Sequence, residues 1–266
     1  MIPRVALRTG LFILASFLAG CGGGEGGGAS ATPPPPPPAN TGGEIALLFM
    51  GNSHTSANSL PQMVAAMVRA ARPGRGVIAI EAENWMFLEE RAMDLASLQL
   101  LRSRQWTFVV LQAQKYSSSG LFDYPIDGAV TLVRIARAQH ATPILFPEWP
   151  RLGIPETQRI FDLHTSIARV EPACVPPLPQ AWDAALARSP QLQLHADDGN
   201  HSAPAGAFLA ALVIATTMTG MPPSQLPYLP AFPVDAATQA LLRGVAAETV
   251  LAYAPRLYCP LDPPLP

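Results

Sequence analysis

Four short apolar runs stand out in the pattern of hydrophobic and polar positions along the chain. They are rich in Val, Ile, Leu and Phe and show no alternation of polar and apolar residues. Runs of this length and kind are typical of strands that are buried on both faces of a parallel sheet. We therefore expect strands at residues 44–50, 77–81, 107–112 and 143–146.

Between and after these runs, hydrophobic residues recur at helical spacing. The first such stretch ends at Arg72-Pro73-Gly74, which combines a charge, a helix breaker and a flexible residue. An alternation of strand and helix is the pattern of the α/β class. We expect helices at residues 60–71, 88–102, 127–140, 157–170, 205–219 and 236–253, and proline-rich loops at 176–179 and 222–233.

Two motifs at opposite ends of the chain carry candidate chemistry. The first predicted strand ends in Gly51-Asn52 and is followed at once by Ser53 and a helical pattern. Such a turn presents a hydroxyl at the start of a helix, where backbone N–H groups favour developing negative charge. Asp198 and His201 lie before a later helical pattern. There the carboxylate can orient the imidazole, and the imidazole can act as a base for the serine.

Each motif alone has a simpler interpretation. A serine after Gly-Asn is most often a turn or helix-capping residue, and Asp198 with His201 alone would be a cap beside a surface histidine. The two motifs together, in this order, favour catalysis. His54 is a less suitable base than His201, because a neighbour on the first turn of a helix points about 100 degrees away from Ser53. Surface or capping positions are expected for His140, His164 and His195.

The segments Gly51-Asn52-Ser53-x-Thr55 and Asp198-Gly199-x-His201 resemble the two end motifs of a bacterial branch of the SGNH (GDSL-type) hydrolases. The resemblance spans roughly residues 44 to 255. It implies a flavodoxin-like three-layer α/β/α sandwich around a central parallel sheet, and an ester hydrolase that needs neither a metal nor a cofactor. It also implies roles for three residues, with Ser53 as nucleophile, His201 as base and Asp198 as the group that orients the imidazole.

The same resemblance predicts an oxyanion hole, with departures from the family pattern. The backbone N–H of Ser53 is one expected donor. The family's Gly-x-Asn-Asp motif aligns with Gln112-Ala113-Gln114-Lys115. Because a glutamine amide donates as an asparagine amide does, Gln114 is the first candidate and Gln112 the second. Where the family has a glycine after the second strand, this chain reads Glu81-Ala82-Glu83-Asn84-Trp85, and Asn84 is the candidate there.

Ligands of open α/β sheets bind beyond the carboxyl ends of the strands, so the polar loop at residues 115–124 should lie near Ser53. Aromatic residues near this edge are candidate walls for a sugar or an acyl group, and core packing is the alternative. Glu148, after the fourth strand, could reach the same edge, but a lone carboxylate is more often a surface or capping residue, and that interpretation is favoured. The candidate walls are Trp85, Tyr116, Tyr124 and Trp149.

The composition fits one globular catalytic domain. Of 266 residues, 49% are hydrophobic and only 14% are charged, which excludes a largely disordered chain. The formal net charge is −2, and no basic cluster occurs beyond the extreme amino terminus. A nucleic-acid partner is therefore not expected.

The amino terminus has the pattern of an export signal. Arg4 and Arg8 precede an apolar stretch at residues 11–17 that is too short to span a membrane. Leu18-Ala19-Gly20-Cys21 resembles a bacterial lipobox, and an ordinary signal peptide is the alternative. We expect a signal peptide at residues 1–21, a Gly- and Pro-rich tether at 22–43 and the hydrolase domain at 44–266. Lipid on Cys21 would be the attachment to a membrane, by analogy the outer membrane.

The two remaining cysteines bear on the compartment. An exported chain meets oxidising conditions, so Cys174 and Cys259 are expected either to form a disulfide or to be buried thiols. Neither has metal-ligand spacing, so no zinc site is expected.

Taken together, these features predict an exported serine ester hydrolase that acts on O-acetyl groups of carbohydrate. One alternative is a lipid or aryl esterase of the same fold. The other is a surface glycan-binding lipoprotein without turnover, motivated by the glutamines in place of asparagine and by the missing glycine.

Overall fold

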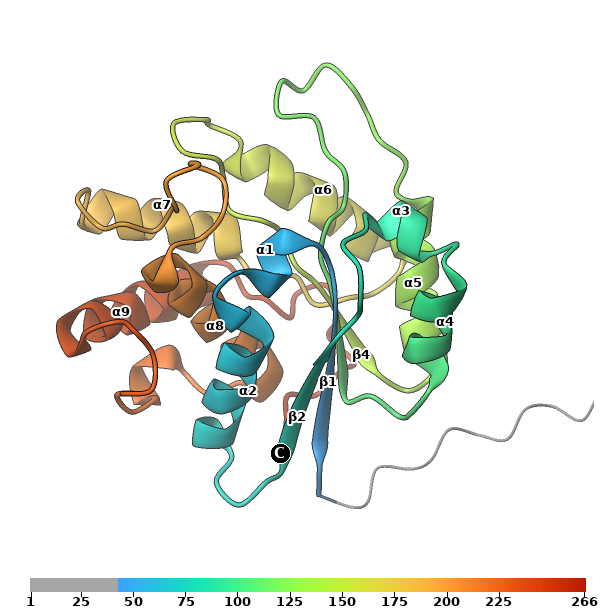
Figure 1. The fold of residues 1–266 in the computed structure, drawn as a ribbon, viewed down its shortest axis with the longest axis horizontal. Helices are drawn as coiled ribbons and strands as arrows, with labels where there is room; N and C mark the ends of the chain where they lie inside the picture. The colour runs from blue at the N-terminus through green and yellow to red at the C-terminus, as the bar shows by residue number, and fades with distance from the viewer. Residues whose placement is uncertain (1–42) are drawn as a thin grey trace, which may run out of the picture. The chain divides into compact units, whose positions relative to one another are not determined.

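A computed structural model of the protein describes residues 43–266. Four parallel strands form its central sheet in the order β2-β1-β3-β4, as Figure 1 shows. Their bounds are β1 (Ile45–Met50), β2 (Val77–Glu81), β3 (Phe108–Leu111) and β4 (Thr142–Leu145). The predicted α/β class with a parallel sheet is confirmed. The predicted signal peptide, lipidated Cys21 and tether up to residue 42 lie outside the described residues.

Helices cover both faces of the sheet and make three layers (Figure 1). Successive side chains of a strand point to opposite faces. The odd-numbered residues of β1 pack with α2 (Leu60–Ala71), α7 (Leu178–Arg188), α8 (Pro204–Thr219) and α9 (Ala236–Ala252). Its even-numbered residues pack with α3 (Leu88–Arg91), α4 (Leu95–Arg102) and α5 (Asp127–Ala138). Helix α6 (Thr157–Val170) contacts both α5 and α7.

Helix α8 is the most deeply buried helix of the described chain. Every residue from Gly206 to Thr219 is buried, and none of them is charged. A helix that is apolar all round belongs in a core, and α8 packs there against α2 and α9. Among residues 43–266 there is no helix with both the length and the apolar character to cross a membrane.

Two regions differ from the helices predicted from the sequence. The stretch at residues 88–102 is two helices, because Asp94 interrupts it and caps α4 by accepting a hydrogen bond from the N–H of Ser97 at 2.7 Å. The loop predicted at residues 176–179 contains the first turn of α7. A proline is tolerated in that turn because its missing N–H would have no partner there.

The carboxyl-terminal segment is fastened to the domain at several points. Cys174 and Cys259 form a disulfide, and Cys174 lies beside Ile144 of β4 in an isolated parallel bridge. Arg72, at the end of α2, donates to the carbonyl groups of Thr219 and Leu265 at 2.6 Å each. The end of the chain is thus part of the folded domain.

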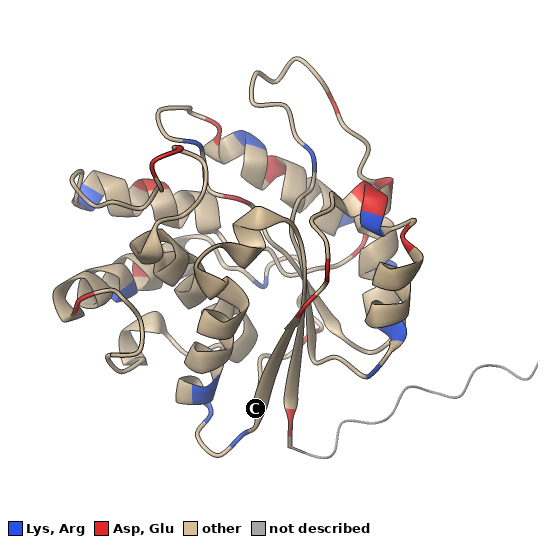
Figure 2. Cartoon of the chain, viewed as in Figure 1, with Lys and Arg blue, Asp and Glu red and all other residues tan. Residues whose placement is uncertain are grey.

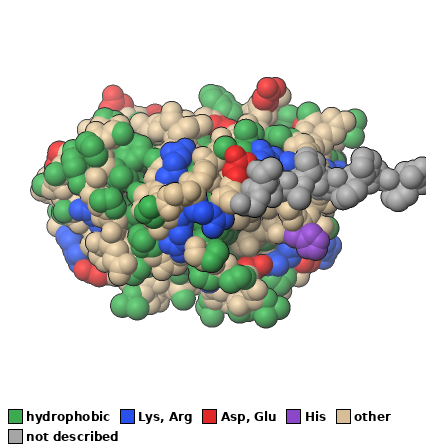
Figure 3. All heavy atoms as spheres, turned by 90° about the horizontal axis from the view of Figure 1, so that it is seen from below, with side chains coloured by type: hydrophobic (Ala, Val, Ile, Leu, Met, Phe, Trp, Pro, Cys, Tyr) green, Lys and Arg blue, Asp and Glu red, His purple; other side chains and the backbone are tan. Residues whose placement is uncertain are grey.

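Charges of both signs are spread over the surface (Figure 2). At the end of the molecule where the strands begin, arginine side chains lie beside acidic and apolar ones (Figure 3). Arg104 pairs with Glu44 and Arg137 pairs with Asp262 at 2.7 Å. Partly exposed pairs of this kind contribute little to stability.

Two histidines lie inside the domain, where the sequence predicts surface or capping positions. His164 and His195 are both buried, so that prediction is wrong for them, whereas His140 is exposed. On α6, Nδ1–H of His164 donates to the carbonyl of Ile160 at 2.8 Å. Its Nε2 is buried and has no partner among the described residues. Burial lowers the pKa of His164 to about 4, because apolar surroundings disfavour the charged ring.

The folded domain should therefore become less stable as the pH is lowered and His164 becomes protonated in the unfolded chain. The unfolded chain binds a proton near pH 6.5, but the folded chain binds it only near 4. Between these values the unfolded state holds more protons, so the free energy of unfolding decreases as pH falls, by about 2 kcal/mol at pH 5. Thermal unfolding of wild type and His164→Gln at pH 7 and pH 5 measures the effect. From pH 7 to pH 5, the melting temperature of the wild type should fall further than that of the variant. Equal decreases would refute the lowered pKa of His164.

The disulfide should contribute measurably to stability. It joins residues 85 positions apart, and a cross-link of this kind stabilises by about 2–5 kcal/mol. We expect the variant Cys174→Ser/Cys259→Ser to unfold at a lower denaturant concentration than the wild type. A reducing agent should shift the wild-type midpoint towards that of the variant and leave the variant unchanged. A wild-type midpoint indifferent to the reductant would show that the bond is absent or without effect.

Candidate active site

Ser53 lies at the carboxyl edge of the sheet, directly after β1. Gly51 and Asn52 form the turn, and Ser53 begins the short helix α1 (Ser53–Ser56). Asn52 caps this helix, because its Oδ1 accepts a hydrogen bond from the N–H of His54 at 3.1 Å. The backbone N–H of Ser53 has no hydrogen-bond partner within residues 43–266.

A hydrogen-bond network from β3 and β4 holds this turn. Gln112 Oε1 accepts from the N–H of Asn52 at 2.8 Å and from Thr55 Oγ1 at 2.9 Å, and Gln112 Nε2 donates to Glu148. The turn requires glycine at position 51, since a Cβ there would lie 2.2 Å from Thr55 Oγ1 and 2.4 Å from Gln112 Oε1. The network therefore sets the backbone immediately before the nucleophile candidate.

A second anchor of the turn is the buried side chain of Arg91, on α3. Its guanidinium donates to the carbonyl of Gly51 at 2.7 Å and to the carbonyl of Asn84 at 2.5 Å. Burial lowers the pKa of Arg91, and the charges of Asp94 and Glu81 oppose this effect. Arg91 thus ties the segment after β1 to the segment after β2.

His201 and Asp198 complete a line of hydrogen bonds with Ser53. His201 Nε2 lies 2.8 Å from Ser53 Oγ, and His201 Nδ1 lies 2.5 Å from Asp198 Oδ2. Because a carboxylate only accepts, it fixes the proton of the neutral ring on Nδ1 and leaves the Nε2 lone pair towards the serine. The motif residues that are 148 positions apart therefore meet in one place.

The Asp198 carboxylate is held in its ionised form. Its hydrogen bond with the His201 ring is the largest cause of a pKa well below the usual range, and bonds from the N–H groups of Asn200 and His201, both at 2.9 Å, add to it. The carboxylate therefore stays charged throughout the pH range in which imidazole groups titrate.

A hydrogen bond between Asn58 and Ser202, which we call the strut, joins the segment that carries Ser53 to the segment that carries His201. Asn58, in the 3-10 turn η1 (Ala57–Ser59), donates from Nδ2 to the carbonyl of Ser202 at 2.7 Å. Ser202 directly follows His201, and Asn58 follows Ser53 by one turn and a half. Asn58 has a left-handed φ of 55°, a conformation that asparagine adopts more easily than most residues. The strut keeps the imidazole beside the hydroxyl.

His54 also belongs to the site, although it does not contact the Ser53 hydroxyl. Its ring stacks on His201 with centroids 4.8 Å apart and lies 5.4 Å from the ring of Trp149. Trp149 in turn stacks on Trp182 at 4.6 Å. A column of aromatic rings therefore connects His201 to the core.

The oxyanion donors predicted from the side chains are not available in the structure. Gln114 Nε2 donates to the carbonyl groups of Lys115 and Pro125, both at 3.1 Å. Gln112 is committed to the network described above. Asn84 lines a separate depression that Ser53 does not line. Of the predicted donors that lie at the pocket, only the N–H of Ser53 is free among the described residues.

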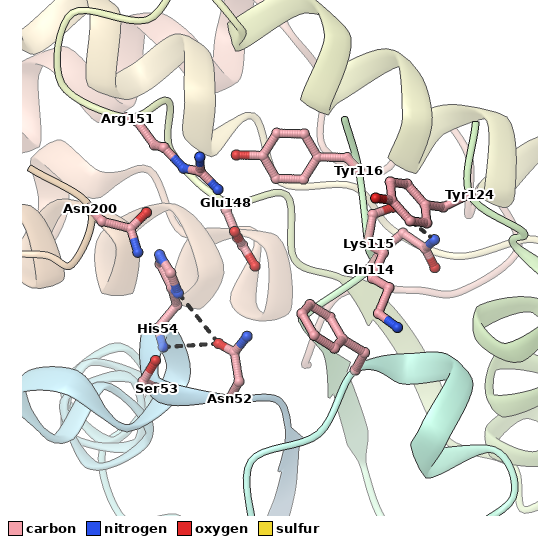
Figure 4. Close-up of a pocket in the computed structure, with 11 residues that line it drawn as sticks. Asn52, Ser53, His54, Gln114, Lys115, Tyr116, Tyr124, Glu148, Arg151 and Asn200 are labelled. Carbon is pink, nitrogen blue, oxygen red and sulfur yellow. Dashed lines mark hydrogen bonds between the residues drawn. The ribbon is translucent and has the colours of Figure 1, made fainter. Parts of the chain in front are cut away.

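Ser53 opens into a pocket of about 460 Å³ (Figure 4). Phe87 is the one purely hydrocarbon side chain among the eleven that line it. The others carry polar groups; they are Asn52, Ser53, His54, Gln114, Lys115, Tyr116, Tyr124, Glu148, Arg151 and Asn200. Within residues 43–266 there is no group of three or more side chains that could hold a metal ion.

The aromatic residues predicted as walls have different fates. Tyr116 and Tyr124 line the pocket, and Tyr116 donates its hydroxyl to the buried Glu156 at 3.0 Å. Trp149 is 1% exposed and packs beneath His54, so its prediction as a wall is wrong. Trp85 is 67% exposed but lies outside the pocket lining, and its Nε1 donates to Ser56 Oγ at 3.0 Å.

Sequence reasoning did not identify several residues that line the pocket. Asn52 and His54 flank the nucleophile candidate, Asn200 precedes His201, and Arg151 follows β4. The signal available for the first three was their position inside the two motifs. For Glu148 the favoured interpretation as a surface or capping residue is wrong and the alternative holds, because Gln112 donates to it and it lines the pocket.

Comparisons with known proteins agree with the fold. A DUF4886 family protein from Bacteroides uniformis has a TM-score of 0.61 at 16% identity, over 79% of this chain and 96% of that one. A protein from Slackia heliotrinireducens, provisionally described as an SGNH hydrolase, has a TM-score of 0.53 at 25% identity, over 66% of this chain and 99% of that one. No family model and no curated protein matches the sequence. The domain thus has an SGNH-hydrolase-like α/β fold.

Proposed function

We propose that this protein is a serine ester hydrolase in which Ser53 is the nucleophile, His201 the base and Asp198 the group that orients the imidazole. The observation that carries the proposal is the line of hydrogen bonds from Ser53 Oγ to His201 Nε2 at 2.8 Å and from His201 Nδ1 to Asp198 Oδ2 at 2.5 Å. The likeness to the Slackia heliotrinireducens protein supports the same class.

The geometry supports an acyl-enzyme mechanism. Ser53 Oγ attacks the ester carbonyl while its proton moves to His201 Nε2, and the carbonyl electron pair moves onto oxygen. The free N–H of Ser53 donates to that oxyanion. The intermediate collapses, and His201 passes the proton to the departing alcohol. A water activated by the same imidazole then releases the acid.

The pocket favours a hydroxyl-rich ester with a short acyl group. Its lining is polar except for Phe87, and an alkyl chain placed against these side chains would desolvate them without supplying hydrogen bonds. The hydroxyls of a sugar can instead bond to groups such as Glu148, Arg151 and Asn200. We therefore propose an O-acetylesterase that acts on carbohydrate, and we propose export with lipid on Cys21, which would bring the domain to such substrates.

Replacement of the nucleophile should abolish turnover. We expect Ser53→Ala and His201→Ala each to lower kcat for p-nitrophenyl acetate by at least about 10³-fold, with melting temperatures near that of the wild type. The double variant should be no slower than either single variant, because the two groups act in the same step. His140→Ala, an exposed histidine, is the matched control and should keep full activity. Wild-type turnover in Ser53→Ala would refute the enzymatic proposal.

The acyl preference should follow the polar lining of the pocket. We expect kcat/KM for p-nitrophenyl acetate to exceed that for the octanoate by at least about tenfold, since a buried polar group left without a partner costs about 1–3 kcal/mol. Acetate release from an acetylated xylan, measured with wild type and Ser53→Ala, tests the carbohydrate substrate. A preference for octanoate, or no release above the Ser53→Ala control, would favour the lipid or aryl esterase instead.

A further inference from the structure

An oxyanion hole built from one donor would be incomplete. The tetrahedral oxygen accepts more than one hydrogen bond, and removal of a single donor typically costs about 2.7–4 kcal/mol of barrier. In this structure Ser53 provides one free N–H, whereas the amides of Gln112 and Gln114 are both bonded elsewhere. A complete oxyanion hole therefore needs a second free N–H near Ser53.

The side chain of Asn52 has the required free amide. Its Oδ1 accepts from the N–H of His54 at 3.1 Å and lies 3.3 Å from His54 Nδ1. A backbone N–H can only donate, so this contact identifies the bonded atom as the oxygen and directs Nδ2 the other way. Figure 4 shows the amide nitrogen of Asn52 turned away from His54 and into the pocket that Ser53 also lines. Within residues 43–266 this nitrogen has no hydrogen-bond partner.

The backbone of Asn52 is fixed independently of its side chain. Its N–H donates to Gln112 Oε1 at 2.8 Å, and the carbonyl of the preceding Gly51 accepts from Arg91 at 2.7 Å. The amide therefore needs no rearrangement when negative charge develops, which is the condition under which such donors are most effective.

His54 completes the arrangement from the other side. Its ring is confined between His201 and Trp149, with centroid distances of 4.8 Å and 5.4 Å. In this position the tautomer that carries hydrogen on Nδ1 donates a second bond to Asn52 Oδ1 at 3.3 Å. The packing of His54 thus keeps the amide of Asn52 from turning its oxygen towards the pocket.

We propose that the Asn52 side-chain amide is the second donor of the oxyanion hole, and that His54 is the positioning residue that sets the orientation of this amide. The inference rests on the proposed esterase function. In the acylation step Asn52 Nδ2–H donates to the carbonyl oxygen as the Ser53–carbon bond forms. Asn52 gives up no proton, since the proton of Ser53 goes to His201 and then to the leaving alcohol.

Two substitutions of Asn52 test the donor. Asp and Ser cap a helix about as well as Asn does and keep an acceptor for the N–H of His54, but neither supplies the amide N–H. We expect Asn52→Asp and Asn52→Ser to lower kcat for p-nitrophenyl acetate by about 10²–10³-fold, with KM changed less than about threefold and melting temperature preserved. Gln114→Leu should lower kcat less than either Asn52 variant does, and His140→Ala, an exposed residue outside the pocket, should keep full activity.

The outcomes separate this inference from the proposed function. If Ser53→Ala is inactive and both Asn52 variants keep kcat within about threefold of the wild type, the donor assignment is overturned and the esterase stands. A 10²-fold loss in Gln114→Leu alone would transfer the role to Gln114. If Ser53→Ala is as active as the wild type, the esterase proposal itself fails.

A double-mutant cycle tests the positioning role of His54. His54→Phe keeps a flat ring between Trp149 and His201 but removes Nδ1–H. We expect a loss of about tenfold in kcat, and we expect His54→Phe/Asn52→Ser to be no slower than Asn52→Ser alone, because the ring acts through the amide. A residue with a merely structural role would reduce the rate by the same factor in both backgrounds, and that result would overturn the positioning role.

Discussion

The packing of α8 inside the core is the constraint on which the geometry of the site depends. His201 lies in the tight turn that leads into this helix, so the position of α8 beside α2 decides where the imidazole stands relative to α1. Gly206 permits the contact, since a Cβ there would lie 2.2 Å from the carbonyl of Leu194 and 2.3 Å from Trp182. The strut from Asn58 to Ser202 then holds the two surface segments together above this core.

The parallel sheet explains why the remaining groups converge on the same edge. The carboxyl ends of β1, β3 and β4 are neighbours in the sheet order, and residues that follow β3 and β4 form a chain of hydrogen bonds that ends at the turn before Ser53. Gln112 after β3 bonds to the backbone of Asn52, and Glu148 after β4 accepts from Gln112. Residues from three neighbouring strands are thus linked by hydrogen bonds that hold the single turn before Ser53. Because every link is a hydrogen bond between buried or half-buried groups, loss of any one would leave a partner unsatisfied.

The class of fold and the meeting of Ser53 with His201 could be predicted from the sequence, because both depend on local patterns. Buried parallel strands leave uninterrupted apolar runs, and the two motifs contain the residues that meet. The fate of Gln114 could not be predicted, since carbonyls of the 115–125 segment compete for its amide only in the folded chain. The burial of Trp149 and His164 could not be predicted either, because it follows from how the helices lie on the sheet.

Most polar groups around Ser53 are hydrogen-bonded to other protein groups, whereas a few donors have no protein partner. Around Ser53, the amides of Gln112 and Gln114, the terminal nitrogens of Arg91 and the carboxylate of Asp198 all have protein partners. Donors without a protein partner are satisfied by solvent or by a substrate, so they mark where new negative charge can be accepted. The networks that hold the backbone keep these donors in place before the substrate arrives, so that little reorganisation is needed as the charge forms.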